Sequence, residues 1–353
     1  MKDNDDGTRD YNTDSLMDAL GGPMVADNLP TGFSPDSVAA KPTPEESLAQ
    51  IGMSSDEIQH AAKHDLDFLA AMLMPLVFTY CFPNVFKSAW QWLLDYIHKH
   101  REFPQLALGL PRGFGKSTFM KIFLVYCILF TDRKFILVVA ATAKLAQNIV
   151  SDVMANIIAV FGDWKLGVEK DTQELKKFGY RGRNITIAAA GAETKVRGLN
   201  VNNERPDVIL MDDIQSRECA DSPVQSESLE NWMIGTLMKA KSPSGCMFLF
   251  IANMYPTKLS LLRKLKHNPA WMKFIAGGIL ADGTSLWEEL QPIKQLVKEF
   301  ENDLAMGHPE IFYAEVLNDE NINANNLIDL SKLPIVPYQE GDIPAGNFIV
   351  IDP

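Results

Sequence analysis

Short apolar runs of strand length recur through the middle of the chain, separated by helix-length segments. The runs are rich in aliphatic and β-branched residues and span 106–109, 135–141, 185–190, 208–211 and 247–251. Helices are predicted between them at 119–130 and 145–161. Continuous apolar strands that alternate with helices are typical of a parallel sheet buried on both faces. The pattern therefore predicts an α/β fold with helices on both faces of a parallel sheet.

The flanking segments are more helical. Before the first run, a capped start at 54–57 predicts a helix over 58–74, and a break at Phe82-Pro83 precedes an amphipathic helix over 86–98. After the last run come a strand-like 274–280, helices at 293–304 and 309–317, and an Asn-rich stretch at 318–326. The final 347–353 has the pattern of a strand that is cut off early, so we expect a chain truncated between two domains.

Charge is distributed unevenly along the chain. The formal net charge is −12, but the first fifty residues hold ten Asp or Glu against three Lys or Arg. That composition predicts a disordered acidic tail. The remainder is only mildly acidic, so the overall charge does not exclude basic patches that bind nucleic acid.

Four cysteines are widely spaced without a metal-ligand pattern, which predicts reduced core residues: Cys81, Cys127, Cys219 and Cys246. The N-terminus has no apolar signal core, and the longest apolar runs are shorter than the roughly 20 residues of a membrane span. The sequence therefore predicts a cytosolic protein without a membrane segment.

A glycine-rich stretch, LPRGFGKST at 110–118, follows the first apolar run and opens a predicted helix. Strand, loop and helix in this order form a phosphate-binding loop, in which backbone N–H groups and the helix N-terminus hold the anion. Gly113 and Gly115 would let the backbone approach, Lys116 would reach the outer phosphates, and Ser117 and Thr118 would complete the nucleotide and magnesium contacts. The consensus has glycine where this chain has Leu110.

Two further strands end in polar residues that suit the same site. Asp212, at the end of 208–211, is predicted to hold Mg²⁺ with Ser117, and Asp213 to orient or deprotonate the attacking water. Asn253 follows 247–251 and would sense the terminal phosphate, or else is only a turn residue. A solvated Asp-Asp turn is the plainer alternative for the acidic pair. Because about ninety residues separate Lys116 from Asp212, the acidic strand is predicted not to be the next in sequence, as in motor and helicase ATPases.

Several basic residues have less specific interpretations. Arg112, inside the glycine-rich loop, either neutralises the nucleotide or pairs across a subunit boundary. The segment 165–183 would track a phosphate backbone or form a solvated helix face. A loop carrying Lys195 and Arg197 would contact phosphate or DNA, or would be solvated. The same two interpretations apply to the basic cluster of Arg263, Lys264, Lys266 and Lys273.

The order of these pieces resembles the large terminase subunit of tailed bacteriophages, the motor that packages viral DNA. The resemblance covers roughly residues 55–353. It is carried by PRGFGKST, by VRGLN followed by RPDVILMDDI, by FLFIAN, by GTSLW at 283–287, and by IFYAEVLND at 311–319. Terminases often have Glu where this chain has Asp213, and Thr where it has Asn253.

The resemblance implies a P-loop NTPase fold with a lid and a separate nuclease. The expected parts are a disordered tail (1–50), an ATPase domain (51–260), a helical lid or linker (261–337) and the first strand of an RNase H-like nuclease (338–353). Asp352 would be the first metal ligand of that nuclease, whose other ligands are missing, so the chain should not cut DNA. Gln91 would contact adenine, and Arg112, Lys116 and Asp213 would carry catalysis.

The resemblance also implies cofactors and partners. ATP and Mg²⁺ would drive double-stranded DNA into a procapsid, with a portal protein, a small terminase subunit and a homo-oligomeric ring, in the host cell cytoplasm. Two alternatives remain open from the residues themselves. One is a helicase-like DNA-remodelling ATPase, which would need a second α/β domain. The other is an interaction module with a vestigial site, favoured by Leu110 in place of glycine.

Overall fold

The computed structural model describes residues 55–74, 80–161, 167–180, 182–196, 200–201 and 203–320. The predicted acidic tail and the strand predicted over 347–353 lie outside these residues, as do Arg197 and Asp352. None of the described helices is long and apolar enough to cross a membrane.

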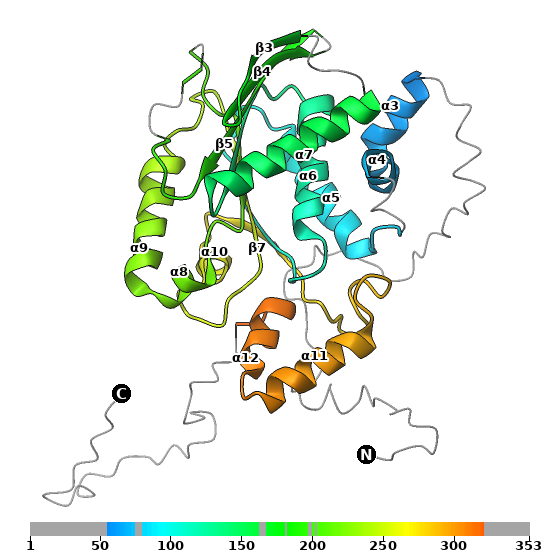
Figure 1. The fold of residues 1–353 in the computed structure, drawn as a ribbon, viewed down its shortest axis with the longest axis vertical. Coiled ribbons are helices and arrows are strands. Elements are labelled where there is room, and N and C mark those ends of the chain that lie inside the picture. The colour runs from blue at the N-terminus through cyan, green and yellow to red at the C-terminus, as the bar shows by residue number, and fades with distance from the viewer. Residues whose placement is uncertain are drawn as a thin grey trace, which may run out of the picture.

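An eight-stranded sheet forms the centre of the described structure, in the order β3-β4-β5-β2-β6-β7-β1-β8 (Figure 1). The six strands from β5 to β8 in this order run parallel, whereas β3 and β4 are an antiparallel extension. The strand bounds are β1 Gln105–Gly109, β2 Phe135–Ala140, β3 Val168–Asp171, β4 Leu175–Tyr180, β5 Arg183–Gly191, β6 Val208–Asp212, β7 Met247–Ala252 and β8 Met272–Ile275. The prediction of an α/β fold around a parallel sheet is confirmed.

Helices pack on both faces of the sheet (Figure 1). One face is covered by α5 (Asn84–Ile97), α6 (Lys116–Phe130) and α7 (Ala143–Phe161), and the other by α9 (Pro223–Trp232) and α10 (Leu261–His267). Two short elements, α8 (Arg217–Asp221) and the π-helical turn η3 (Met233–Leu237), flank α9. From Phe119 to Leu129, α6 is buried except at Lys121, because its sequence is apolar nearly all round.

The strand order decides which side chains meet at the edge of the sheet. β1 leads into the glycine-rich loop, β6 ends at Asp212, and β7 lies between them and leads to Asn253. In the chain, β2 to β5 come between β1 and β6, so the acidic strand is not the next in sequence, as predicted. The carboxyl ends of these adjacent parallel strands thus form one edge, where open α/β sheets bind ligands.

Two local predictions are wrong. The helix predicted over 58–74 is two helices, α3 (Ser55–His64) and α4 (Leu66–Leu73), because the carboxylate of Asp65 caps α4 by accepting a hydrogen bond from the Phe68 N–H at 3.1 Å. The segment 165–183, for which a solvated helix face was one interpretation, contains the strands β3 and β4 instead. Lys176 and Lys177 lie on β4 and pair with Asp171 and Glu169 of β3.

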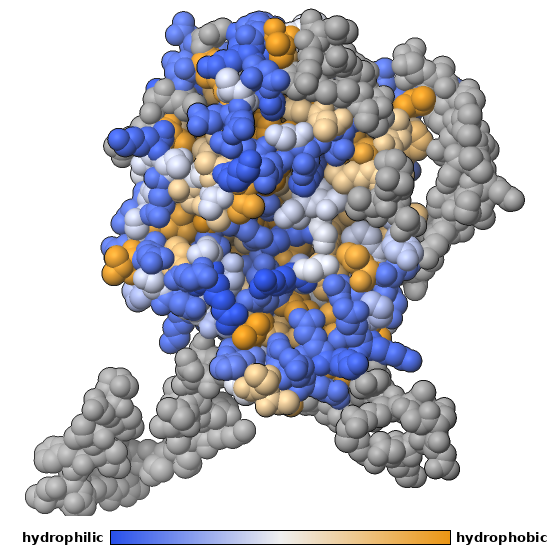
Figure 2. All heavy atoms as spheres, in the orientation of Figure 1, coloured by the Kyte–Doolittle hydropathy of each residue, from blue (hydrophilic) through white to orange (hydrophobic). Residues whose placement is uncertain are grey.

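The sheet also continues beyond the predicted domain boundary at residue 260. β8 pairs with β1, so the sheet extends to Ile275. The segment that follows, with α11 (Ile293–Ala305), α12 (Pro309–Ile311) and the π-helical turn η4 (Phe312–Val316), packs into the same apolar core. Trp287, for example, lies 5.2 Å from Phe82 between ring centroids. Hydrophilic residues cover the outer side of α11, in the lower part of Figure 2.

Candidate functional site

The glycine-rich loop at 110–115 joins β1 to the N-terminus of α6. Among the described loop residues, φ is positive only at Gly113 (81°) and Gly115 (74°), a region in which a Cβ is strained. Leu110 needs no such freedom, because it is fully buried and its N–H donates to the Ala252 carbonyl at 3.1 Å, beyond the end of β1. Leucine at this position therefore extends the strand and packs in the core, which leaves the two glycines to shape the loop.

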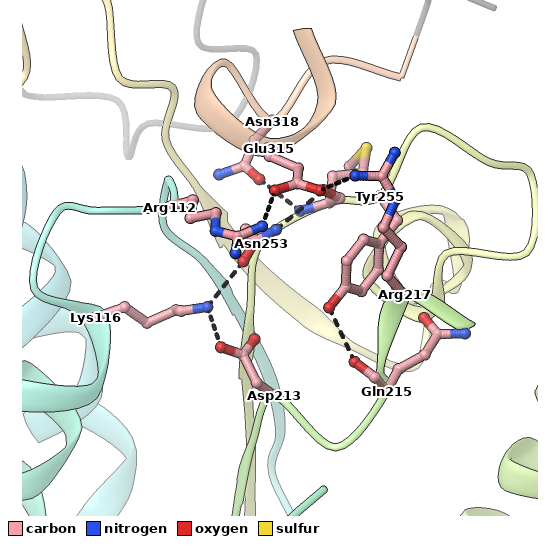
Figure 3. Close-up of polar contacts among 10 residues, drawn as sticks. Arg112, Lys116, Asp213, Gln215, Arg217, Asn253, Tyr255, Glu315 and Asn318 are labelled. Atoms are coloured by element: carbon pink, nitrogen blue, oxygen red, sulfur yellow. Dashed lines mark hydrogen bonds and ion pairs between the residues drawn. The ribbon is translucent and has the colours of Figure 1, made fainter. Parts of the chain in front are cut away.

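Lys116 lies where the loop, the acidic strand and β7 meet (Figure 3). Its side chain is buried, and its Nζ lies 2.5 Å from Asp213 Oδ2 and 3.1 Å from Asn253 Oδ1. The Asn253 amide nitrogen donates to the Met254 carbonyl at 3.2 Å, which orients the oxygen of the side chain toward the lysine. Lys116 is thus in direct polar contact with two residues that lie 97 and 137 positions away in the chain.

Asp213 is held in an unusual backbone conformation. Its φ is 43°, and its N–H donates to the Ile251 carbonyl at 3.0 Å. A non-glycine residue in the left-handed region is strained, and such strain concentrates at functional sites. About 40% of the Asp213 side chain is exposed, so its carboxylate borders the open cavity while the preceding Asp212 stays inside.

Asp212 is the most perturbed carboxylate of the site. Burial and the adjacent Asp213 raise its pKa from 3.8 to about 6, although Lys116 and a hydrogen bond with Ser117 act in the opposite direction. Its Oδ1 is buried and has no hydrogen-bond partner among the described residues. A buried, unsatisfied carboxylate oxygen beside a serine hydroxyl fits a Mg²⁺ site in which phosphate and water supply the other ligands.

Arg112 is paired within its own chain, a contact that the sequence did not indicate. Its guanidinium forms an ion pair with Glu315 of η4, and its backbone N–H donates to the Glu315 carbonyl at 2.8 Å. Glu315 is almost completely buried. Nearby, the Gln291 amide donates to the Gly113 carbonyl at 3.4 Å. The C-terminal helical segment therefore holds the glycine-rich loop at two points.

A cavity of about 690 Å³ opens beside these residues, a volume suited to a nucleotide. Its lining comprises the loop and helix residues Arg112, Gly113, Gly115, Lys116, Ser117 and Thr118, together with Ala141, Asp213, Gln215, Ser216, Arg217, Glu218, Asn253 and Tyr255. The N-terminus of α6, with its free N–H groups, forms part of the wall.

The sequence did not indicate the residues that support this cavity. The Tyr255 hydroxyl donates to the Gln215 carbonyl at 3.1 Å, and burial together with Asp213 and Glu315 raises the pKa of Tyr255 to about 12. Asn318 joins two segments, since it accepts from the Met254 N–H and donates to the Ala276 carbonyl, both at 2.8 Å. One feature of the sequence could have indicated Glu315: it is an ionisable residue inside the apolar run IFYAEVL, and a buried charge needs a partner.

Other predicted residues lie elsewhere. Gln91 is exposed on α5, bonds to Asp95 and does not line the cavity, so the structure does not bring the predicted adenine contact to the site. Lys195 lines a separate cavity of about 600 Å³ beside β5. Within the basic cluster near α10, Arg263 and Lys266 pair with Glu320, and Lys264 pairs with Glu230. Two carboxylates thus lie against this cluster and offset part of its charge.

No protein-family model matches this chain, and no curated protein sequence matches it. Two solved structures that align with it are large terminases. The large terminase of the thermophilic bacteriophage D6E aligns with 12% identity and a TM-score of 0.40 over 67% of this chain and 53% of that chain. The ATPase domain of the Thermus phage P74-26 large terminase aligns with 16% identity and a TM-score of 0.39 over 64% and 91%. The chain thus spans about half the length of the D6E protein, and the residue roles proposed below rest on its own contacts.

Proposed function

We propose that this chain is an ATPase, with the cavity around Lys116 as its nucleotide site. The observation that carries the proposal is the meeting of Lys116, Asp213 and Asn253 at 2.5 and 3.1 Å, from three elements that the fold brings to one sheet edge. Lysine at the start of a helix behind a glycine-rich loop binds outer phosphates. An adjacent exposed carboxylate supplies the group that acts on water.

Lys116 and Asp213 change partners in the proposed reaction. Without nucleotide they pair with each other, which stabilises the buried ammonium. A triphosphate in the loop offers Lys116 a stronger anion, and Asp213 is then released to orient the attacking water and accept its proton. Asn253 stays in contact with Lys116 on its other side. The position of the Asn253 side chain therefore depends on whether Lys116 binds Asp213 or phosphate.

The charges around the cavity favour a nucleotide that binds together with a divalent cation. Three cationic side chains, Arg112, Lys116 and Arg217, lie among four carboxylates, those of Asp212, Asp213, Glu218 and Glu315. A free triphosphate would meet a net negative site. Ser117 and Asp212 would hold Mg²⁺, which would offset the negative charge of the phosphates and of the nearby carboxylates.

The finer proposal is a DNA-packaging motor of the large terminase type, which moves double-stranded DNA together with a portal protein, a small terminase subunit and further copies of itself. It is supported by the order of the sequence motifs and by the contacts of Glu315 and Gln291 with the glycine-rich loop. Such contacts transmit a change at the phosphates to the C-terminal segment.

The ATPase proposal is tested by phosphate release with Mg²⁺ and ATP. Lys116→Ala and Asp213→Asn should each lower turnover at least about 100-fold, since each removes a group that acts on the transferred phosphate or its nucleophile. Matched controls are Lys134→Ala, exposed at the opposite edge of the sheet, and Asp221→Asn, exposed on α8. Wild-type turnover in both site variants would contradict the proposal.

DNA movement needs a separate assay. A third strand annealed to duplex DNA is displaced by a protein that translocates along the duplex, whereas strand separation requires a helicase. We expect ATP-dependent displacement of the third strand with both duplex strands still paired, for the full chain together with its portal partner. Unwinding of the duplex would favour the helicase-like alternative.

A further inference from the structure

Two arginines share the single carboxylate of Glu315. Arg112 approaches it from the glycine-rich loop and Arg217 from the start of α8, on opposite sides (Figure 3). The Glu315 side chain is only 3% exposed, whereas those of Arg112 and Arg217 are 67% and 43% exposed. One carboxylate cannot fully neutralise two guanidinium groups, so one of the two cations is available to another anion.

The contacts show which arginine is available. Arg112 forms a close ion pair with Glu315 Oε2 and a backbone hydrogen bond with the same residue. Arg217 Nη1 lies 3.6 Å from Oε1, which is beyond hydrogen-bonding distance, and Oε1 has no hydrogen-bond partner among the described residues. A long, half-exposed ion pair contributes little stability. Releasing Arg217 therefore costs little, and Glu315 remains paired with Arg112.

Arg217 is also placed for a phosphate. It follows Asp213 by four residues, and both line the cavity with Lys116. The intervening Gln215 is fixed: its Oε1 accepts from the Leu261 N–H at 2.7 Å, and its carbonyl accepts from the Tyr255 hydroxyl. The carboxylate of the adjacent Glu218 also lies at this wall of the cavity, so the site is not uniformly basic.

We propose that Arg217, rather than Arg112, is the cation of this chain that contacts the terminal phosphate of the bound nucleotide. The inference rests on the proposed ATPase function and adds a residue to it. Arg112 instead ties the glycine-rich loop to η4. A planar guanidinium donates two hydrogen bonds to phosphate oxygens, which a lysine in the same place cannot reproduce.

The test compares affinities for ADP and for the β,γ-imido analogue of ATP, both with Mg²⁺, by calorimetric titration. Arg217→Ala should weaken binding of the triphosphate about 10- to 100-fold, as expected for a lost charge-assisted hydrogen bond, and leave ADP binding unchanged. Arg217→Lys should restore part of the loss. Arg205→Ala, exposed and outside the cavity, is the matched control and should behave like the wild type.

Other results of these titrations would overturn the role of Arg217 or the proposed function. Equal weakening of ADP and triphosphate binding, or a lowered melting temperature in Arg217→Ala, would assign the residue a structural role and overturn the inference. Unchanged binding of both nucleotides would also overturn it, while the ATPase proposal would stand. If the wild-type chain bound neither nucleotide, the proposed function itself would fail, and the inference with it.

Discussion

The contact between Arg112 and Glu315 should couple the glycine-rich loop to the C-terminal helical segment by a measurable free energy. Two limits bracket its size. Exposed ion pairs contribute about 0.2–1 kcal/mol, and breaking a fully buried pair costs about 3–5 kcal/mol. Here one partner is 3% exposed and the other 67%. Since the arginine can turn to water when the carboxylate is removed, we expect a coupling energy of about 1–2 kcal/mol, between these limits.

A double-mutant cycle measures this coupling. Arg112→Ala, Glu315→Gln and the double variant are compared with the wild type in urea unfolding. The backbone hydrogen bond between the two residues survives in all of them, so the cycle isolates the side chains. Glu301→Gln, exposed on α11, is the control and should leave the unfolding free energy unchanged. If the effects of the two substitutions add within about 0.5 kcal/mol, the reasoning is refuted.

Two further predictions concern stability. Folding raises the pKa of Asp212 from 3.8 to about 6, so the unfolded chain ionises first and the native state loses stability as pH rises between these values. Asp212→Asn should therefore stabilise the Mg²⁺-free protein by up to about 3 kcal/mol at pH 8 and less at pH 5, and an equal gain at both would contradict this. A Cβ on Gly245 would lie 1.9 Å from the His100 carbonyl oxygen, whereas one on Gly182 meets nothing within 4 Å. Gly245→Ala should accordingly lower the melting temperature far more than Gly182→Ala, and similar shifts would show that the 98–104 turn moves aside.

The sequence was most informative where burial imposes a simple pattern. β2, β6 and β7 are buried along their whole length, so each appears in the sequence as an apolar run; Asp212 ends β6, and Asn253 follows β7. β4 lies toward one end of the sheet, and its residues alternate between buried and half-buried. Its lysines interrupt the apolar pattern, so the sequence did not identify it as a strand. The more nearly a strand is surrounded by other elements, the better its pattern identifies it.

The candidate site was predictable only in part, for a related reason. Residues that emerge from strand ends or from the glycine-rich loop have their positions set by local structure, and Lys116, Asp213 and Asn253 do meet. Glu315 lies far along the chain and contacts Arg112 and Arg217 only because η4 packs beside the loop, which periodicity does not encode. The pairing of Arg112 depends on that packing too, so its partner could not be derived from the loop sequence.

The central claim is that Asp213 acts on water after Lys116 has bound the phosphates. It is tested most directly by measuring MgATP binding and single-turnover hydrolysis on the same samples of wild type, Asp213→Asn and Lys116→Ala. We predict that Asp213→Asn binds MgATP as tightly as the wild type or tighter, because Lys116 loses its competing carboxylate, yet does not hydrolyse it, while Lys116→Ala loses binding. Hydrolysis by Asp213→Asn at the wild-type rate would contradict the account.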